Sequence, residues 1–522
     1  MASRPRLFYN NDASFLHYSS PPMTTDDFVY ETVGRFAGTQ VDALVCHMFG
    51  FGTATPLYPT EVPEAAGIDF EQVDFVEVWR QQEILKGFKA KGQDPWTQAV
   101  EVAHSAGIQY WAGMRFNDLH GAIFEWSNEF SLNHPEYKLG EKCGSGLHRP
   151  GESCRGLDFT IPEVRAHRLA LLEEVCTRYD VDGFEWDFLR EPGHHVPDIE
   201  SGRSVLTDYL REARKVLQRI GEQRGRPLGF GIRVPGTPEK CHDIGLEVES
   251  WIKDGLVDIV SPAPYWDTAT DLPFDAFVAM ARNTSCRVYA CTSEQVGPGP
   301  YRPAPPETLR AGALNAWHQG VDGIYIFNFH HTTMTNIDDS ELFSQLGDLK
   351  TLATKNKQYM VAGGHAAVKQ YPHGSPMFEA FQHQLPSVLK EWSTGPGHTV
   401  RFTVGDDLKM AANRGILDAV ILELTVVDFT SEDQFEFRLN GKRLPQGPQL
   451  ELHPHHYRAG YGHTASNGHY VLRYDLRIGD WIRQGLNELD LVLRRRNPKV
   501  RVEFGVHDLR LEINYRTLPM RG

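Results

Sequence analysis

Strand-like and helix-like segments alternate eight times along the first two-thirds of the chain. Repetition of strand and helix at this rhythm predicts a parallel sheet. The count of eight favours closure into a (β/α)8 TIM barrel, an α/β fold, over an open, doubly wound sheet. The strands are expected at Arg6–Asn11, Ala43–Phe49, Ile108–Asp118, Tyr179–Arg190, Leu228–Pro235, Asp258–Trp266, Arg287–Glu294 and Gly323–His330.

The helix-like stretches lie between these strands. A long insertion, Gly50–Gly92, precedes the helix that Asp94 and Pro95 open as N-cap and first helical residue. The others are expected at about Thr25–Gly38, Pro162–Arg178, Gly202–Gln223, within His242–Asp254, Phe274–Arg282, Pro306–Gln319 and Asp338–Leu352.

After Thr354 the pattern changes to short alternating segments separated by turn signals such as Asn440-Gly441. This pattern predicts a smaller antiparallel β-sandwich, jelly-roll-like, so the chain divides into a barrel over 1–355 and a sandwich over 356–522. Gly485–Leu491 resembles the end of galactose-binding-like modules, which implies an accessory, carbohydrate-binding-like domain; a structural lid against the barrel is the preferred alternative. Strands are expected at Thr399–Val404, Ala419–Asp428, Phe435–Leu439, Tyr470–Leu476, Asn487–Leu493 and Val500–Tyr515.

Composition narrows the class of protein. The 41% hydrophobic and 23% charged fractions are those of a soluble globular protein. A formal net charge of −15 argues against a nucleic-acid partner, and no apolar run is long enough for membrane insertion. The first residues lead directly into a strand without an apolar signal region, so we expect a cytoplasmic protein, or an exported one whose leader has been removed. Seven cysteines, an odd number, argue against a disulfide framework.

The most informative stretch is the fourth strand, because its apolar run ends in charge. Glu185 and Asp187 are two residues apart, so on a strand their side chains point to the same face. Burying two carboxylates there is costly unless the site needs them. Ion pairing with Arg115 or Arg233 inside the barrel mouth is the structural alternative to a catalytic role.

Chemistry in such barrels is done at the C-terminal ends of the strands. Aromatic side chains there, Trp186 and Trp266 among them, suit stacking on sugar rings. No histidine, cysteine or acid spacing is typical of a zinc site, so we expect no metal and no cofactor. The polar or aromatic residues near the strand ends are Asn11, Asp12, His47, Arg115, Asn117, Asp118, Glu185, Trp186, Asp187, Arg233, Tyr265, Trp266, Asp267, Glu294, Asn328 and His330.

Acids together with aromatics indicate glycoside hydrolysis, which needs one protonated and one ionised carboxyl group. Asp187, at the end of its strand, is the candidate nucleophile or base, and Arg115 or Arg233 could keep it charged. Glu294 and Asp267 are the candidate proton donors, with Glu185 and Glu191 in reserve. Acceptance of a substrate hydroxyl is the preferred role of Glu185. The expected sugar contacts are His47, Arg115, Asn117, Trp186, Arg233, Tyr265, Trp266, Asn328 and His330.

Three motifs, His134–Tyr137, Leu157–Arg165 and Tyr179–Phe188, together resemble the glycoside-hydrolase-like family 10, a family of bacterial TIM-barrel glycosidases. The fourth strand is also similar to that of α-amylase-type and α-galactosidase-type barrels. The resemblance implies polysaccharide degradation and a nucleophile at the final Asp of this strand, Asp187. The chain departs from the pattern at Glu185 and Trp186, which leaves the role of Glu185 open. Pairing Glu185 or Asp187 with Glu294 is the alternative.

Two rival functions stay open. A lyase or isomerase of acidic sugars would use His47 or His330 as its base, and the two arginines would suit an anionic sugar. Neutralisation of Glu185 and Asp187 is the preferred use of those arginines. A non-catalytic carbohydrate-binding barrel is the second rival. A carbohydrate substrate is the expected partner, and self-association into a homo-oligomer is left open.

Overall fold

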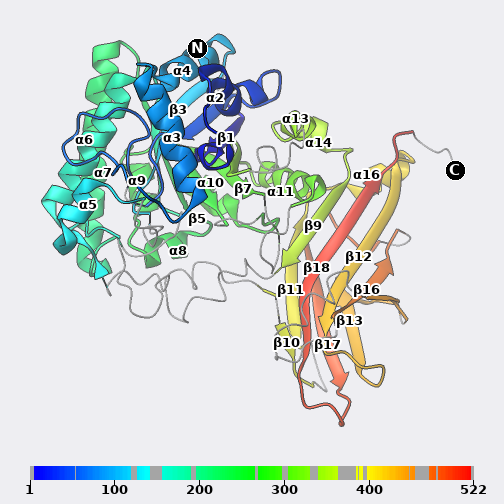
Figure 1. Ribbon diagram of the computed structural model, residues 1–522. Helices are drawn as coiled ribbons and strands as arrows, with labels where there is room; N and C mark the ends of the chain where they lie inside the picture. The colour runs from blue at the N-terminus through cyan, green and yellow to red at the C-terminus, as the bar shows by residue number, and fades with distance from the viewer. Residues whose placement is uncertain are drawn as a thin grey trace.

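The structure is a computed structural model that describes residues 5–52, 54–118, 126–140, 156–189, 195–264, 268–294, 296, 304–329, 339–362, 384–385, 387–391, 397–445, 447–452, 469–477 and 480–518. Its first part is a closed barrel of eight parallel strands in chain order. An antiparallel β-sandwich follows, coloured yellow to red beside the blue-to-green barrel in Figure 1. The predicted fold class is therefore confirmed. The barrel strands are β1 (Leu7–Asn11), β2 (Ala43–His47), β3 (Gln109–Arg115), β4 (Gly183–Asp187), β5 (Gly229–Pro235), β6 (Ile259–Ala263), β7 (Arg287–Ser293) and β8 (Gly323–Phe327).

The helices around the barrel follow the expected order, but the structure also contains helices outside the expected ranges. The insertion after β2 contains an unexpected helix, α3 (Val76–Ala90), and the last expected helix is two short ones, α13 (Ser340–Phe343) and α14 (Leu349–Leu352). Asp94 caps α4 (Pro95–Ser105) by accepting from Trp96 N, as predicted. The remaining helices are α1 (Phe15–Tyr18), α2 (Thr25–Thr32), η1 (Gly34–Phe36), α5 (Glu129–Asn133), η4 (Pro135–Tyr137), α6 (Pro162–Arg178), α7 (Ile199–Arg224), α8 (Pro238–Asp243), α9 (Val248–Lys253), α10 (Phe274–Ala281) and α11 (Pro306–His318). None of the described helices is both long and apolar enough to cross a bilayer.

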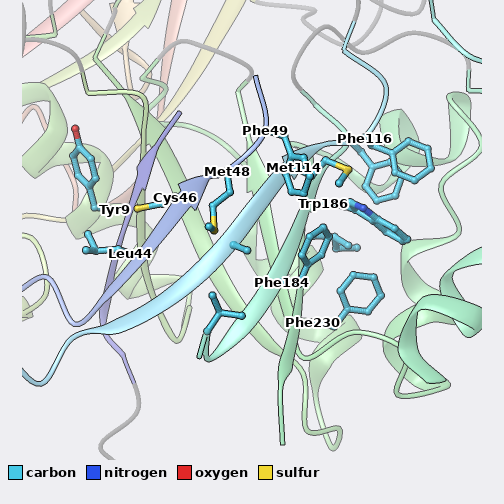
Figure 2. Packing of buried hydrophobic residues seen from close by; sticks show 14 of the residues in the cluster. Tyr9, Leu44, Cys46, Met48, Phe49, Met114, Phe116, Phe184, Trp186 and Phe230 are labelled. Atoms are coloured by element: carbon cyan, nitrogen blue, oxygen red, sulfur yellow. The ribbon is translucent and has the colours of Figure 1, made fainter. Parts of the chain in front are cut away.

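The main core fills the layer between the barrel strands and these helices. Alternate residues of each strand face this layer, as Met114, Phe184 and Trp186 do in Figure 2. The Trp186 ring stacks on Tyr209 of α7, with ring centroids 5.0 Å apart, and is edge-on to Phe230. Glu185 and Asp187, which alternate with Phe184 and Trp186 on β4, therefore face the barrel axis.

A second, smaller cluster fills the inside of the barrel. The Trp111 indole lies across the barrel where β4 and β5 carry Gly183 and Gly229. A Cβ on Gly183 would come within 2.5 Å of the indole, and one on Gly229 within 2.2 Å. Glycine at both positions is therefore what makes room for the tryptophan.

The sandwich has two sheets. One has the order β10-β18-β12-β16-β15 with β9 also on β18, and the other has the order β11-β17-β13-β14. A short helix, α16 (Leu408–Asn413), connects β11 to β12. The strands are β9 (Lys357–Ala362), β10 (Ser387–Leu389), β11 (His398–Val404), β12 (Leu417–Val427), β13 (Gln434–Leu439), β14 (Lys442–Arg443), β15 (Gln449–Leu452), β16 (His469–Asp475), β17 (Gly485–Arg495) and β18 (Phe504–Tyr515).

Helix α11 joins the barrel to the sandwich. Ala311 of α11 is buried in the sandwich core. The Asn315 amide, also on α11, donates to Thr270 O of the barrel part at 2.6 Å and to Thr403 O of β11 at 2.8 Å. The two parts therefore share a helix as well as a covalent connection.

Candidate active site

Four polar residues lie side by side on the inner face of the barrel, at the C-terminal ends of neighbouring strands. Arg115 of β3 is in register with Asp187 of β4, which is in register with Arg233 of β5. Arg233 is in turn in register with Ser261 of β6. The strand-end position that sequence predicts for Asp187 and Arg233 is therefore the inner rim of the barrel.

Asp187 and Arg233 form a buried ion pair. Arg233 Nη1 donates to both carboxylate oxygens of Asp187 at 3.0 Å. Asp187 Oδ1 also accepts from the backbone N–H of Leu189 at 2.9 Å. On its other side the Arg233 guanidinium lies over the Phe327 ring, 3.5 Å from the centroid. Two neighbours thus orient this arginine toward Asp187, which is the partner that the sequence suggested.

Glu185 lies one layer deeper in the barrel and belongs to a hydrogen-bonded chain. Tyr325 of β8 donates its hydroxyl to Glu185 Oε1 at 2.6 Å. Asn10 of β1 donates to the Tyr325 hydroxyl at 2.9 Å, and its amide also lies 3.1 Å from His47 Nε2. The chain links β1, β2, β4 and β8 across the barrel interior.

Burial shifts the pKa values of two members of this hydrogen-bonded series, Glu185 and His47, in the directions that favour their neutral forms. Burial raises the pKa of Glu185 to about 8, with the bond from Tyr325 opposing the shift and the charge of Asp187 adding to it. Burial, helped by the charge of Arg115, lowers the pKa of His47 to about 4. At neutral pH Glu185 is therefore mostly protonated and His47 is uncharged.

Arg115 is used differently from Arg233. It does not bind Asp187 but donates to Asp12 Oδ2 at 2.8 Å and to Asp118 Oδ2 at 2.9 Å. Asn328 completes this cluster by donating to Asp12 Oδ2 at 2.7 Å, and its backbone is held at a φ of 46°. After glycine, asparagine is among the residues that most readily adopt this left-handed conformation, so the sequence fits the backbone here.

Two of the predicted sugar contacts have other uses. The prediction for Trp186 is wrong, because the alternation that turns Glu185 and Asp187 inward turns the indole outward onto α7. The Asn117 amide binds the backbone N–H and C=O of Leu157 at 2.9 and 3.0 Å, so it holds a neighbouring loop segment.

Of the remaining predicted catalytic and sugar-binding residues named below, the structure describes only Glu294. Glu294 follows β7 with 6% of its surface exposed, and its backbone oxygen accepts from Ala304 N. The other five lie outside the described residues: Glu191, Tyr265, Trp266, Asp267 and His330.

Sequence patterns do not single out several members of these networks. Asp12 and Asp118 are predicted only as strand-end residues, and Tyr325 and Asn10 are not predicted at all. The signal for Tyr325 was the alternation of β8, where Tyr325 and Phe327 share one face. Within the described ranges, no group of three or more histidine, cysteine or acidic residues could hold a metal ion.

No protein-family model matches the chain, so nothing supports the specific family 10 resemblance. No curated protein matches the sequence either.

Similar solved structures are glycoside hydrolases and related TIM-barrel enzymes. They include the glycoside hydrolase domain of PgaB (BpsB) from Bordetella bronchiseptica, with 12% identity, TM-score 0.41, and 66% of this chain and 99% of that chain covered. A maltogenic α-amylase from Thermotoga neapolitana has 14% identity, TM-score 0.39, and coverages of 69% and 80%. A cycloisomaltooligosaccharide glucanotransferase from Paenibacillus sp. has 11% identity and TM-score 0.38; 97% of this chain is covered, but the chain spans only 57% of that protein.

The chain is thus a TIM-barrel protein with a C-terminal β-sandwich. Likeness at these identities carries no argument about substrate or catalytic residues. Any assignment of activity has to rest on the inner rim of the barrel.

Proposed function

We propose that the chain is a glycoside hydrolase that cleaves an oligo- or polysaccharide at the C-terminal mouth of its barrel. The observation that carries the proposal is the position of Asp187 at the C-terminal end of β4, on the inner rim of the barrel, where Arg233 Nη1 donates to both of its carboxylate oxygens. Glycoside hydrolysis needs a carboxylate at the mouth of the barrel and a second, protonated carboxyl group opposite it.

In this mechanism Asp187 is the ionised partner, acting as nucleophile or as base on water. Its position at the end of β4 and the orienting contacts of Arg233 support that role. Glu294 or Asp267 is the proton donor. Glu185 stays a reserve donor, because its carboxyl lies deeper in the barrel and is bound to Tyr325.

The acid–base chemistry of a lyase is less well supported. A base that removes a proton from carbon needs a substantial pKa, and that of His47 is lowered to about 4. Arg115 and Arg233 are each bound to aspartates, so neither guanidinium is available without first losing a carboxylate partner.

The test is turnover of aryl glycosides and oligosaccharides, neutral and acidic, by wild type, Asp187→Asn and a matched control, Asp182→Asn. Asp182 binds His104 and Arg226 at the opposite end of the barrel from the mouth. We expect hydrolysis by the wild type and by the control, and a loss of about 10³-fold or more in Asp187→Asn. Equal activity of wild type and Asp187→Asn would move the site to other acids.

The donor is identified by the leaving group. Departure of a good leaving group needs little protonation, so the donor's amide variant should keep activity on dinitrophenyl glycosides and lose it on alkyl glycosides. Glu294→Gln, Asp267→Asn and Glu185→Gln are compared in this way. Products that absorb in the ultraviolet as conjugated double bonds would instead indicate a lyase.

A further inference from the structure

The insertion between β2 and α4 forms two adjoining hollows on either side of α3. The first has a volume of about 530 Å³ and lies between α3, α4 and the chain around residues 50–69. The second, of about 580 Å³, lies between α3 and residues 70–76. Gln82 and Lys86 line both hollows, so the two are neighbours across one edge of the helix.

The first hollow adjoins the mouth of the barrel. Phe51 and Trp126 belong to its wall. The Phe51 ring lies 4.1 Å from the Arg115 guanidinium, and the Trp126 ring stacks on His17 with centroids 5.8 Å apart. A ligand in this hollow is therefore separated from the Arg115 cluster by the thickness of one side chain.

The second hollow is bordered by exposed aromatic residues. Phe75 is 43% exposed and Trp79 46% exposed, and both line this hollow. Exposed apolar surface concentrated beside a hollow marks a binding surface.

Charged side chains of both signs line the hollows, with no excess of cations that would favour an anionic ligand: Asp69, Lys86, Lys89 and Asp94 in the first, and Glu71, Glu83 and Lys86 in the second. The other polar groups are amides and hydroxyls. Lys86 binds Asp69 at 2.6 Å and Glu83 at 3.3 Å. Gln81 and Gln82 line the first hollow together with Thr55 and Thr60, and Gln72 lines the second. Aromatic faces beside uncharged hydrogen-bonding groups match a sugar, which has an apolar ring face and a rim of hydroxyls.

We propose that the two hollows hold successive units of an uncharged carbohydrate chain whose reacting end lies at the barrel mouth. The proposal rests on the proposed hydrolase function and assigns it a substrate class, a neutral oligo- or polysaccharide. The order along the chain is mouth, then Phe51 and Trp126, then the edge of α3 at Gln82, then Trp79.

The experiment is titration calorimetry of the full chain with cellohexaose, maltohexaose and chitohexaose and with the corresponding monosaccharides. We expect one hexaose to bind at least about tenfold more tightly than its monosaccharide, because the monosaccharide fills one subsite only. Trp79→Ala should weaken hexaose binding about five- to tenfold through loss of one stacking face. Leu85→Trp, which fills the first hollow, should weaken it at least as much.

Gln98→Trp is the matched control, since it adds the same indole to the exposed face of α4, away from both hollows. It should bind the hexaose as the wild type does. Thermal melting of each variant confirms that it is folded, and Gln82→Ala replaces Leu85→Trp if the larger side chain prevents folding.

Failure of this inference differs from failure of the proposed function. Hexaose binding that is sensitive to Trp79→Ala and Leu85→Trp, but without hydrolysis, keeps the groove and removes the hydrolase. Hydrolysis with hexaose affinity unchanged in both variants overturns the groove and keeps the hydrolase. Absence of hexaose binding, or a wild-type dimer that Trp79→Ala dissociates, also overturns the groove.

Discussion

Arg233 Nη1 lies 3.0 Å from both carboxylate oxygens of Asp187, and neither side chain has any exposed surface. Burial by itself would lower the pKa of Arg233, but the charge of Asp187 raises it above its usual value. The arginine is therefore charged at every pH of interest, and removing it alone would leave a buried carboxylate without its cation.

Replacing Arg233 with Gln should destabilise the protein by about 3–5 kcal/mol, because one partner of a buried ion pair is lost while the other stays. Activity should fall together with stability. Urea denaturation and turnover of the best substrate measure the two effects.

The double variant Asp187→Leu/Arg233→Met separates stability from catalysis. An apolar replacement of the whole pair is often neutral, so we expect most of the stability to return without activity. Full recovery of activity in the double variant would show that the pair is only structural.

Glu185 should make the protein less stable as pH rises. The carboxyl has a pKa near its ordinary value of 4.5 when the chain is unfolded and about 8 when it is folded. Between these values the folded state binds a proton that the unfolded state does not, so its stabilising effect is complete below about pH 4.5 and is lost by about pH 8. The expected loss is on the order of 4 kcal/mol.

Glu185→Gln should remove this component, because a glutamine can accept the Tyr325 hydroxyl without titrating. The measurement is the free energy of unfolding from pH 5 to pH 9 for both proteins. Parallel pH profiles would contradict the assignment of the raised pKa to Glu185.

Adding a methyl group at Gly229, against the Trp111 indole, should lower the free energy of unfolding. Gly229→Ala places its Cβ 2.2 Å from the indole, where both the ring and the strand would have to move. We expect a loss of about 1–3 kcal/mol in unfolding free energy. Gly231→Ala is the control on the same face of the same strand, since its nearest neighbour would be 3.6 Å away, an ordinary contact. Thermal melting should rank the two variants in this order.

Another buried ion pair lies in the sandwich. Lys357 Nζ donates to Asp406 Oδ1 at 2.9 Å, and both side chains are fully buried, with Tyr359 and Tyr515 also donating to this carboxylate. Asp406→Asn should therefore destabilise the protein by about 3–5 kcal/mol.

Asp418→Asn is the surface control for that change. Asp418 pairs with Arg516 but is 53% exposed, and exposed pairs contribute about 0–1 kcal/mol. Chemical denaturation followed by tryptophan fluorescence compares the two. A similar small effect in both variants would contradict the view that Asp406 anchors the buried cluster.

Local patterns were sufficient to predict the barrel and much of its inner rim. Period-two alternation places Glu185 and Asp187 on the inner face of β4, and the ends of β4 and β5 are close enough that Arg233 was a foreseeable partner of Asp187. The same alternation places Trp186 on the outer face of β4, against α7, and so argues against a contact between Trp186 and a sugar in the barrel mouth.

Long-range choices could not be predicted from the sequence. Whether Arg115 binds Asp187 or the pair Asp12 and Asp118 depends on side-chain reach around the closed barrel, which no local pattern contains. The helix α3 lies within the insertion Gly50–Gly92, for which the sequence analysis predicts no helix. The division of the chain at residue 355 stays a prediction, although β9 begins two residues later.

The position of α11 has a consequence for how this protein can be rearranged. Its Ala311 is in the core of one part, and its Asn315 amide bridges backbone oxygens of both. The β-sandwich is therefore not an independent domain that could be exchanged for another without disturbing the barrel. Cutting the chain after β8 would expose the face of α11 that packs on the sandwich, and would remove the Thr403 acceptor of the Asn315 amide. The two parts are expected to be inherited, expressed and engineered as one unit.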